Sequence, residues 1–141
     1  MIILDTDHVT VLRYPEDVRH NLLSNKVKAA ADQGVVRTVI TVEEQMRGWM
    51  AKIHKAKTPD EQIQPYERLA SLVHFLAKWQ IEAYDSAAVE QFKNLKKQKI
   101  NIGTQDLKIA SIALSLNALL LSANLKDFDK VPGLRVENWL E

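Results

Sequence analysis

The sequence contains no cysteine among its 141 residues. Disulfide bonds, thiol catalysis and metal sites built on thiolates are therefore excluded, and this composition fits a reducing compartment. Neither sign of charge dominates, because 19 lysine and arginine residues stand against 18 aspartate and glutamate residues. The composition as a whole does not indicate a nucleic-acid binder, so any surface that faces RNA or DNA must be local.

Long apolar runs are also missing. The longest ones, such as residues 118–121, are far too short to cross a bilayer. The chain starts directly with an apolar segment that ends at Asp5, without the basic region and the cleavage site of a signal peptide. We therefore expect a soluble cytoplasmic protein, folded as a single domain over residues 1–141.

The pattern of apolar residues predicts an α/β fold. Strands are predicted at residues 2–4, 35–41, 79–84, 118–122 and 134–136. Helices are predicted at about 7–12, 21–31, 42–57, 66–77, 88–95 and 107–114. Alternation of strands and helices indicates a central, mainly parallel sheet of four to five strands with helices on its faces. A break at 58–60 predicts that the two long helices on either side form a projecting antiparallel hairpin.

Acidic side chains come where expected strands give way to helices or loops. Asp5 ends the first strand, Glu44 follows the second, and Asp106 and Asp127 stand at the corresponding points farther along the chain. In a parallel sheet the carboxyl ends of the strands share one edge, and ligands bind at that edge. Carboxylates gathered there suit Mg²⁺ or Mn²⁺ held against a phosphate.

Structural roles explain some of these acids equally well. We expect Asp7 to cap the first helix. Glu44 stands three residues after Thr41, as in a capping box, and Asp106 lies in a first helical turn, where the helix dipole favours an anion. For both residues, the structural role and metal binding remain open alternatives. Glu43 is a neighbouring candidate, but it points about 100° away around the helix.

Convergence of the four acids has an electrostatic consequence. Two carboxylates about 4 Å apart repel each other by roughly 4 kcal/mol at an effective dielectric constant near 20. A divalent cation, or protonation of one acid, relieves this repulsion. We therefore predict that the metal-free protein keeps at least one of these carboxyl groups protonated near neutral pH.

Four motifs follow one another along the chain. They are Leu4-Asp5-Thr6-Asp7-His8, Val39-Ile40-Thr41-x-x-Glu44-x-x-x-Gly48, Ile102-Gly103-x-x-Asp106-Leu107-x-Ile109-Ala110 and Ser122-x-Asn124-x-x-Asp127-Phe128. Together they resemble the PIN-domain nucleases, and most closely the VapC-type toxins of bacterial type II toxin–antitoxin pairs. The resemblance continues through residues 132–138 and so covers essentially the whole chain.

This resemblance implies a PIN-like three-layer sandwich with Mg²⁺ or Mn²⁺ as its cofactor. It implies metal coordination by Asp5, Glu44, Asp106 and Asp127, supported by Thr6, Ser122 and Asn124. It also favours Glu44 over Glu43, because Gly48 sets the register. The implied activity is metal-dependent hydrolysis of phosphodiester bonds in RNA, which leaves 5′-phosphate and 3′-hydroxyl ends. The implied partners are the RNA substrate, a small antitoxin protein and a second copy of the chain in a homodimer, with no membrane.

Substrate binding also requires cations near the acids. Arg47, Lys108 and Lys126 lie within a few residues of them and are the best candidates for phosphate contacts. The lysines between 93 and 99 are expected to form a solvated helix face. We expect His8 to be a residue on the side of the first helix rather than a catalytic base.

Three other functions are alternatives to this interpretation. One is a PIN-like nuclease in RNA processing that has no antitoxin. Another is a phosphatase of the haloacid-dehalogenase type, because residues 5–9 fit its DxDx[TV] opening, although its late acidic pair is missing here. The last is a PIN-like binding module without catalysis, which the presence of all four acids argues against.

Overall fold

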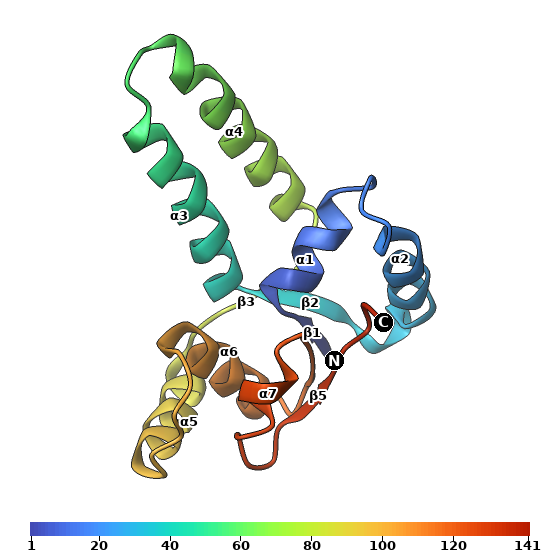
Figure 1. Ribbon diagram of the computed structural model, residues 1–141. Helices are drawn as coiled ribbons and strands as arrows, with labels where there is room; N and C mark the ends of the chain where they lie inside the picture. Colours follow the sequence, from blue (N-terminus) through green and yellow to red (C-terminus); the bar gives the residue numbers. More distant parts are fainter.

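A computed structural model describes the whole chain, Met1–Glu141, and contains one sheet of five parallel strands with helices on both faces (Figure 1). The strands are β1 (Ile2–Leu4), β2 (Val35–Thr38), β3 (Ile81–Glu82), β4 (Leu119–Leu121) and β5 (Arg135–Glu137). Their order in the sheet is β3-β2-β1-β4-β5, and every neighbouring pair is parallel. The predicted parallel α/β sheet is confirmed.

The connections between the strands are mostly helical. The helices are α1 (Thr6–Arg13), α2 (His20–Ala29), α3 (Val39–Lys55), α4 (Ile63–Ala77), α5 (Ser86–Lys97), α6 (Thr104–Ser115) and α7 (Leu125–Phe128). Two short 3-10 helices, η1 (Ala31–Gln33) and η2 (Asp60–Gln62), precede β2 and α4. None of these helices combines the length and the apolar character needed to cross a membrane.

Both faces of the sheet are covered, which explains why its central strands are apolar throughout. Successive side chains of a strand point to opposite faces. Ile3 of β1 belongs to the larger core cluster, together with residues of α5, α6 and α7. Ile2 and Leu4 belong to a second cluster on the other face, where Val9 of α1 packs against them.

The boundary between β2 and α3 differs from the prediction. The strand was expected to continue to Thr41, but β2 ends at Thr38 and α3 begins at Val39. The Thr38 side chain caps α3, because its hydroxyl oxygen accepts a hydrogen bond from the Thr41 N–H at 3.3 Å. The capping box of Thr41 with Glu44, one of the two alternatives left open for Glu44, is therefore not formed. Burial of Ile40 and Thr41 outweighs the weak helix propensity of these β-branched residues.

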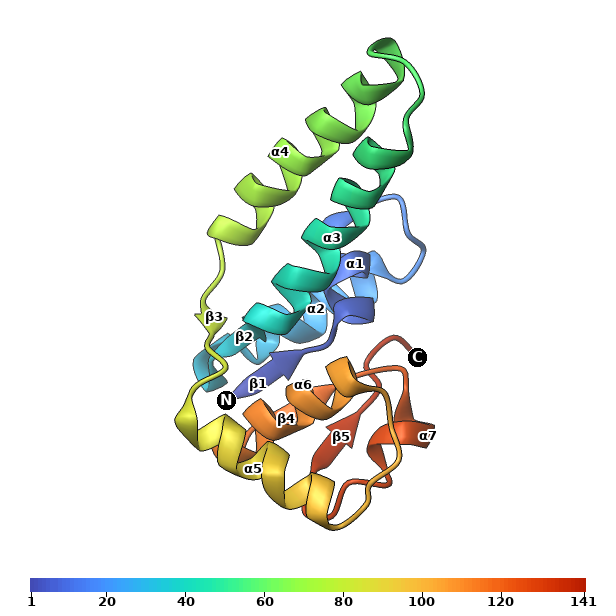
Figure 2. The same cartoon turned by 90° about the vertical axis from the view of Figure 1, so that its left-hand side faces the viewer.

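The predicted hairpin is present. Helices α3 and α4 pack side by side in antiparallel orientation and project away from the sheet (Figures 1 and 2). Large apolar side chains along the hairpin remain open to solvent, since Met50 and Tyr66 are each 55% exposed and Ile63 is 56% exposed. Exposed apolar patches of this kind mark protein interaction surfaces.

Arg37 of β2 is a buried cation at the base of the hairpin. Its side chain is fully buried, and none of its three guanidinium nitrogens has a hydrogen-bond partner. The guanidinium carbon lies 4.1 Å from the centre of the Trp79 ring and 5.1 Å from that of Phe75. Burial lowers the pKa of Arg37 to about 10, so the charge persists at neutral pH. Attraction to the two aromatic faces offsets part of the desolvation cost and holds the end of α4 against the sheet.

Candidate functional site

The candidate site lies at the carboxyl edge of the sheet, between β1 and β4. Chain order along the sheet reverses there, because β2 lies on one side of β1 and β4 on the other. Such a reversal leaves a crevice at the strand ends, which is the usual ligand position in α/β folds. Leu4 pairs with Leu121 in the register of the two strands, so the next residues, Asp5 and Ser122, are neighbours.

Asp5 is the most buried of the candidate acids, with 7% of its surface exposed. Its Oδ1 accepts a hydrogen bond from the Thr6 N–H at 2.7 Å, and its Oδ2 accepts one from the Ser122 hydroxyl at 2.7 Å. Asp5 is therefore the N-cap of α1, and the prediction that Asp7 caps this helix is wrong, because the helix already begins at Thr6. Burial, followed by the nearby negative charge of Asp7, raises the pKa of Asp5 to about 7.

Asn124 joins two more of the predicted acids. Its side-chain nitrogen donates to Asp106 Oδ2 and to Asp127 Oδ2, each at 3.1 Å. Burial, followed by the charges of Asp127 and Asp7, raises the pKa of Asp106. The hydrogen bond from Asn124, together with nearby Lys130, lowers the pKa of Asp127. One neutral amide thus holds two carboxylates that would otherwise repel each other.

Glu44 approaches the site from α3. Its Oε2 accepts a hydrogen bond from the Thr6 hydroxyl at 3.2 Å, and that hydroxyl also lies 3.1 Å from the Thr41 hydroxyl. Burial raises the pKa of Glu44, and the charges of Asp106 and Glu43 raise it further. Its other oxygen, Oε1, is buried without any hydrogen-bond partner. A buried acceptor without a partner is costly, so this atom marks a position where a cation or a proton is favoured.

Glu43 has different partners. Its Oε1 accepts a hydrogen bond from the Gln105 side-chain amide at 2.7 Å, and this bond lowers the pKa of Glu43. Its Oε2 pairs with Arg47 Nη2 at 2.7 Å. Glu43 therefore links α3 with the first turn of α6, while Glu44 contacts Thr6 next to Asp5.

The three candidate phosphate-binding cations have different surroundings. Arg47 is exposed but already paired with Glu43. The ammonium group of Lys108 lies 6.0 Å from the centre of the Tyr84 ring, and Lys126 is exposed on α7. None of the three donates a hydrogen bond to the four predicted metal-binding acids.

Known proteins share this architecture and parts of the sequence. Ribonuclease VapC2 of Haemophilus influenzae is 36% identical over 80 residues, which cover 54% of this chain and 61% of the relative. The tRNA(fMet)-specific endonuclease VapC of Salmonella typhimurium is 26% identical over 84 residues, 57% of this chain and 64% of the relative. The matches thus span about three-fifths of the length of these relatives. No protein-family model matches the sequence.

A solved structure matches along the full length. The crystal structure of VapBC2 from Rickettsia felis, bound to a DNA fragment from its promoter, contains a chain that aligns with a TM-score of 0.73 and 25% identity over 99% of both chains. The chain has the fold of the VapC-type PIN domains. The PIN-like three-layer fold predicted from the motifs is confirmed.

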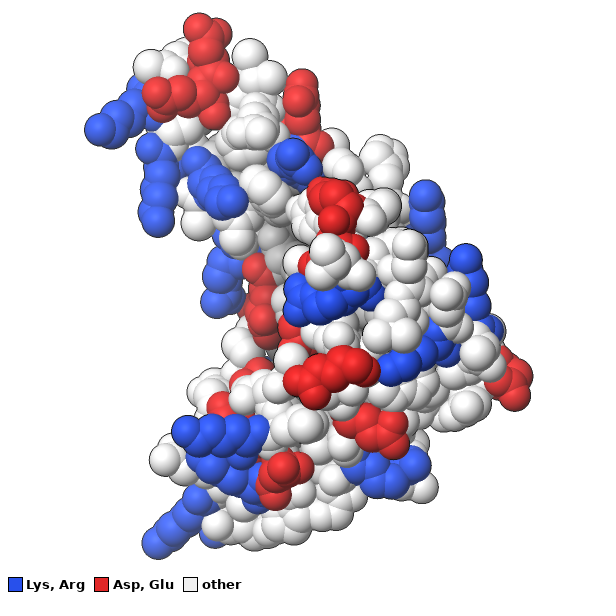
Figure 3. All heavy atoms as spheres, turned by 45° about the vertical axis from the view of Figure 1, so that its right-hand side comes forward, with Lys and Arg blue, Asp and Glu red and all other residues white.

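The four predicted acids of this PIN-like fold lie at one edge but do not form a closed metal cage. Asp106 is their common neighbour, since its charge raises the pKa of both Asp5 and Glu44, and Asp127 raises its own. No three acidic or histidine side chains are close enough together to hold one metal ion in this arrangement. Metal coordination by all four acids therefore stays a prediction. Acidic atoms lie in the recess between the hairpin and the rest of the molecule, with basic side chains on either side of it (Figure 3).

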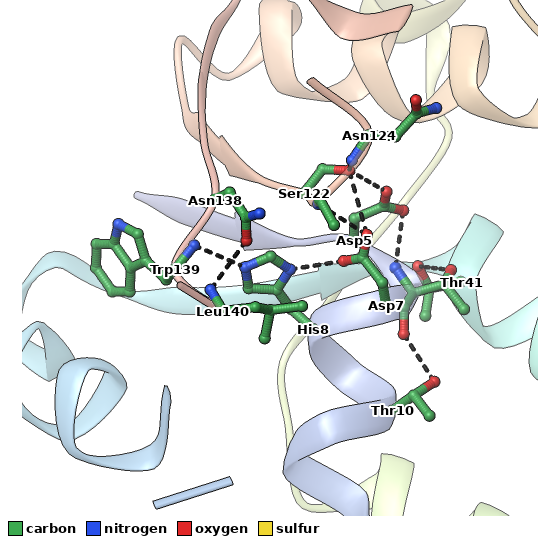
Figure 4. A network of polar contacts seen from close by, with 12 residues as sticks. Asp5, Asp7, His8, Thr10, Thr41, Ser122, Asn124, Asn138, Trp139 and Leu140 are labelled. Carbon is green, nitrogen blue, oxygen red and sulfur yellow. Dashed lines mark hydrogen bonds and ion pairs between the residues drawn. The ribbon is translucent and has the colours of Figure 1, made fainter. Parts of the chain in front are cut away.

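One network that was not predicted from the sequence is formed by Asp7, His8 and Trp139 (Figure 4). Asp7 Oδ1 lies 2.6 Å from His8 Nδ1, and the Trp139 N–H donates to His8 Nε2 at 3.1 Å. Burial favours a higher pKa for Asp7, but the hydrogen bonds from His8 and the Ala123 N–H outweigh it and lower that pKa. Only the proximity of Asp7 and His8 to Asp5 in sequence could have indicated this network, because Trp139 lies near the opposite end of the chain.

Proposed function

We propose that this PIN domain is a Mg²⁺-dependent endoribonuclease that hydrolyses phosphodiester bonds in RNA and acts as the toxin of a toxin–antitoxin pair. The observation that carries the proposal is the cluster of carboxylates at the carboxyl edge of β1 and β4, in which one oxygen of Glu44 is buried without a partner. The names of the relatives, ribonuclease VapC2 and tRNA(fMet)-specific endonuclease VapC, support RNA as the substrate class.

The donor atoms of the site fit a hard divalent cation. The predicted ligands Asp5, Glu44, Asp106 and Asp127 offer only oxygen atoms, which Mg²⁺ and Mn²⁺ prefer over softer metals. Mg²⁺ commonly keeps several waters and uses one or two carboxylates directly. A cluster in which three carboxylates do not converge is compatible with such an ion. Glu44 Oε1, which has no hydrogen-bond partner, supplies an unused oxygen ligand.

Each supporting side chain has a defined task in the proposed mechanism. When bound, the metal neutralises charge on the phosphate and activates an attacking water. Ser122 holds Asp5, Thr6 holds Glu44, and Asn124 holds Asp106 beside Asp127. These hydrogen bonds restrict the carboxylate rotamers before substrate arrives, which is the preorganisation that electrostatic catalysis requires.

Two other chemistries fit the structure less well. A phosphatase of the haloacid-dehalogenase type with Asp5 as the nucleophile also needs a late acidic pair, which this chain lacks. Base catalysis by His8 needs a free ring nitrogen, but both ring nitrogens have partners and the ring is fully buried.

The direct test of the proposed function is RNA cleavage. We expect the purified chain to cut tRNA or rRNA at internal sites when Mg²⁺ or Mn²⁺ is present and to be inactive in EDTA. Products with 5′-phosphate and 3′-hydroxyl ends, identified by end labelling, support the hydrolytic mechanism. Cleavage that persists in EDTA contradicts the metal dependence.

We expect charge reversal at Arg47, Lys108 or Lys126 to weaken RNA binding. Each lost phosphate contact reduces the slope of log affinity against log salt by about one. The effect at Arg47 is expected to be the smallest, because that side chain is already paired with Glu43. Fluorescence anisotropy with single-stranded RNA at several salt concentrations measures the slope, and Lys28→Glu, on the exposed side of α2, is the matched control. An unchanged slope removes the residue from the RNA-binding surface.

The proposed partners are an antitoxin and a second copy of the chain. The exposed apolar side chains of the α3–α4 hairpin support a protein partner, because they would be buried on association. The solved VapBC2 structure from Rickettsia felis is a complex with DNA, and its VapBC composition supports an antitoxin partner here. The proposal places the protein in the cytoplasm, where its RNA substrate is found.

A further inference from the structure

A second hydrogen-bond network lies beside the acids and leads to the end of the chain (Figure 4). His8 of α1 is fully buried, and its two ring nitrogens have different partners. Nδ1 lies 2.6 Å from Asp7 Oδ1, and Nε2 lies 3.1 Å from the backbone nitrogen of Trp139. The ring therefore connects the start of α1 with the segment that follows β5.

The partners of His8 determine where its proton sits. The backbone N–H of Trp139 can only donate, so Nε2 must accept and carries no proton. The ring proton is then on Nδ1, from which it donates to the Asp7 carboxylate. A single tautomer satisfies both contacts, which fixes the ring in one orientation.

The other oxygen of Asp7 holds the loop that follows β4. Asp7 Oδ2 accepts a hydrogen bond from the Ala123 N–H at 2.8 Å. On either side of Ala123, the Ser122 hydroxyl donates to Asp5 and the Asn124 amide donates to Asp106 and Asp127. Asp7 thus binds the centre of a three-residue loop whose two other members orient three of the predicted metal ligands.

The C-terminal segment is firmly placed at the far end of this network. Leu140 is buried in a core cluster with Val11 and Leu23, and the Ser122 N–H donates to the Glu137 carbonyl oxygen at 2.9 Å. The network therefore runs from a packed anchor, through His8 and Asp7, to the loop at the site.

We infer that Asp7 and His8 are positioning residues, which hold the 122–124 loop in register with Asp5 and tie it to the C-terminal segment. The inference rests on the proposed function and deepens it. Neither residue contacts substrate or metal in this assignment: Asp7 acts through Ala123, and His8 acts through Asp7. Outer partners of metal ligands commonly change metal affinity or activity by about 10- to 100-fold when they are replaced.

Asp7→Asn is the first test, because no orientation of an amide satisfies both contacts. If its oxygen faces His8, its nitrogen meets the donating Ala123 N–H; if its oxygen faces Ala123, its nitrogen meets the His8 Nδ1 proton. We expect the Kd for Mn²⁺ to rise and kcat for RNA cleavage to fall, each by about tenfold, with KM for RNA unchanged. Amide exchange at Ala123, measured by NMR, becomes faster.

Two replacements of His8 separate the two halves of the network. His8→Gln can keep an acceptor near the Nε2 position but loses the donor to Asp7, so we expect it to match Asp7→Asn. His8→Asn can keep a donor near the Nδ1 position but loses the acceptor for Trp139. We expect it to retain Mn²⁺ affinity within about twofold of wild type, while amide exchange at Trp139 becomes faster.

His20→Asn is the matched control. His20 Nδ1 lies 3.0 Å from the Val11 carbonyl oxygen on α1, away from the acids, so Mn²⁺ affinity should not change. An affinity loss in this control as large as that in His8→Gln overturns the inference, as does wild-type affinity in His8→Gln. The ¹⁵N shifts of the wild-type His8 ring are a separate readout, and a proton on Nε2 overturns the inference even if no RNA is cleaved. If the wild type shows the expected His8 tautomer and slow amide exchange at Ala123 but cleaves no RNA, the result contradicts the proposed function and leaves the inference standing.

Discussion

Asp5→Asn is expected to lower the rate of RNA cleavage by about 10²–10³-fold, as removal of one charge-stabilising group from an active site typically does. The substitution removes the negative charge and one predicted metal ligand. The fold should tolerate it, because the asparagine Oδ1 can still accept from the Thr6 N–H and cap α1. The Ser122 hydroxyl can turn its proton away and accept a hydrogen bond from the new amide.

The measurement is cleavage of single-stranded RNA in Mg²⁺ by Asp5→Asn, the wild type and Asp129→Asn. Asp129 is an exposed acid directly after α7, so its replacement removes the same charge outside the cluster and should leave the rate unchanged. Equal rates in Asp5→Asn and wild type would show that the cleavage comes from elsewhere. An inactive wild-type protein would favour the binding module without catalysis.

Stability without metal is expected to fall as pH rises towards 7. The pKa of Asp5 in the folded protein is about 7, against an ordinary value of 3.8. Between these pH values the folded state holds a proton that the unfolded state has lost. The free energy of unfolding therefore falls by about 1.4 kcal/mol for each unit by which the pH rises. Above pH 7 the ionised Asp5 lowers the free energy of unfolding by its full amount, roughly 4 kcal/mol. The raised pKa values of Glu44 and Asp106 act in the same direction.

A divalent cation should reverse this loss. Because metal and proton compete for Asp5, we expect the increase in Tm on adding Mn²⁺ to grow from pH 5 to about pH 7 and then to level off. Calorimetry at pH 5–8 in EDTA and in Mn²⁺ measures both trends. Asp5→Asn is the matched control, and its metal-free Tm should fall less with pH. Equal stabilisation by Mn²⁺ at every pH would contradict the competition, and an ordinary acidic pKa for every acid by NMR titration would contradict the clustering itself.

Much of the fold follows from local patterns in the sequence. The apolar run of β1 and the β-branched run of β2 predicted two strands of a parallel sheet, and the break at residues 58–60 predicted the hairpin. The boundary at Val39–Thr41 could not be predicted in this way. These residues favour a strand locally, but the Thr38 cap and the burial of Ile40 place them in the first turn of α3.

The candidate site was only partly accessible from the sequence. Strand-end positions indicated a common edge for Asp5, Glu44 and Asp127, which agrees with the structure. The expectation that Asp106 also follows a strand is wrong, because α5 leads through a loop into α6. Strand-end positions also could not indicate which side chains pair with which. The choice between Asp5 and Asp7 as helix cap depends on the residue at which α1 begins, and a shift of one or two residues changes the cap. The contact of His8 with Trp139 forms because β5 pairs in parallel with β4, so that the segment after β5 starts at the same edge of the sheet as α1, and no local pattern reports it.

Helix α3 has a consequence for control from outside the site. With 17 residues it is about 25 Å long, and it presents Thr41 and Glu44 at its inner end while its outer end carries the solvent-exposed hairpin. Helix α3 therefore connects the crevice with the exposed end of the hairpin. A protein that binds the exposed end of the hairpin and tilts α3 would displace Glu44 without entering the crevice. By the same reasoning, deletion of the hairpin would also affect the site, because α3 is one of its two helices and carries Glu44.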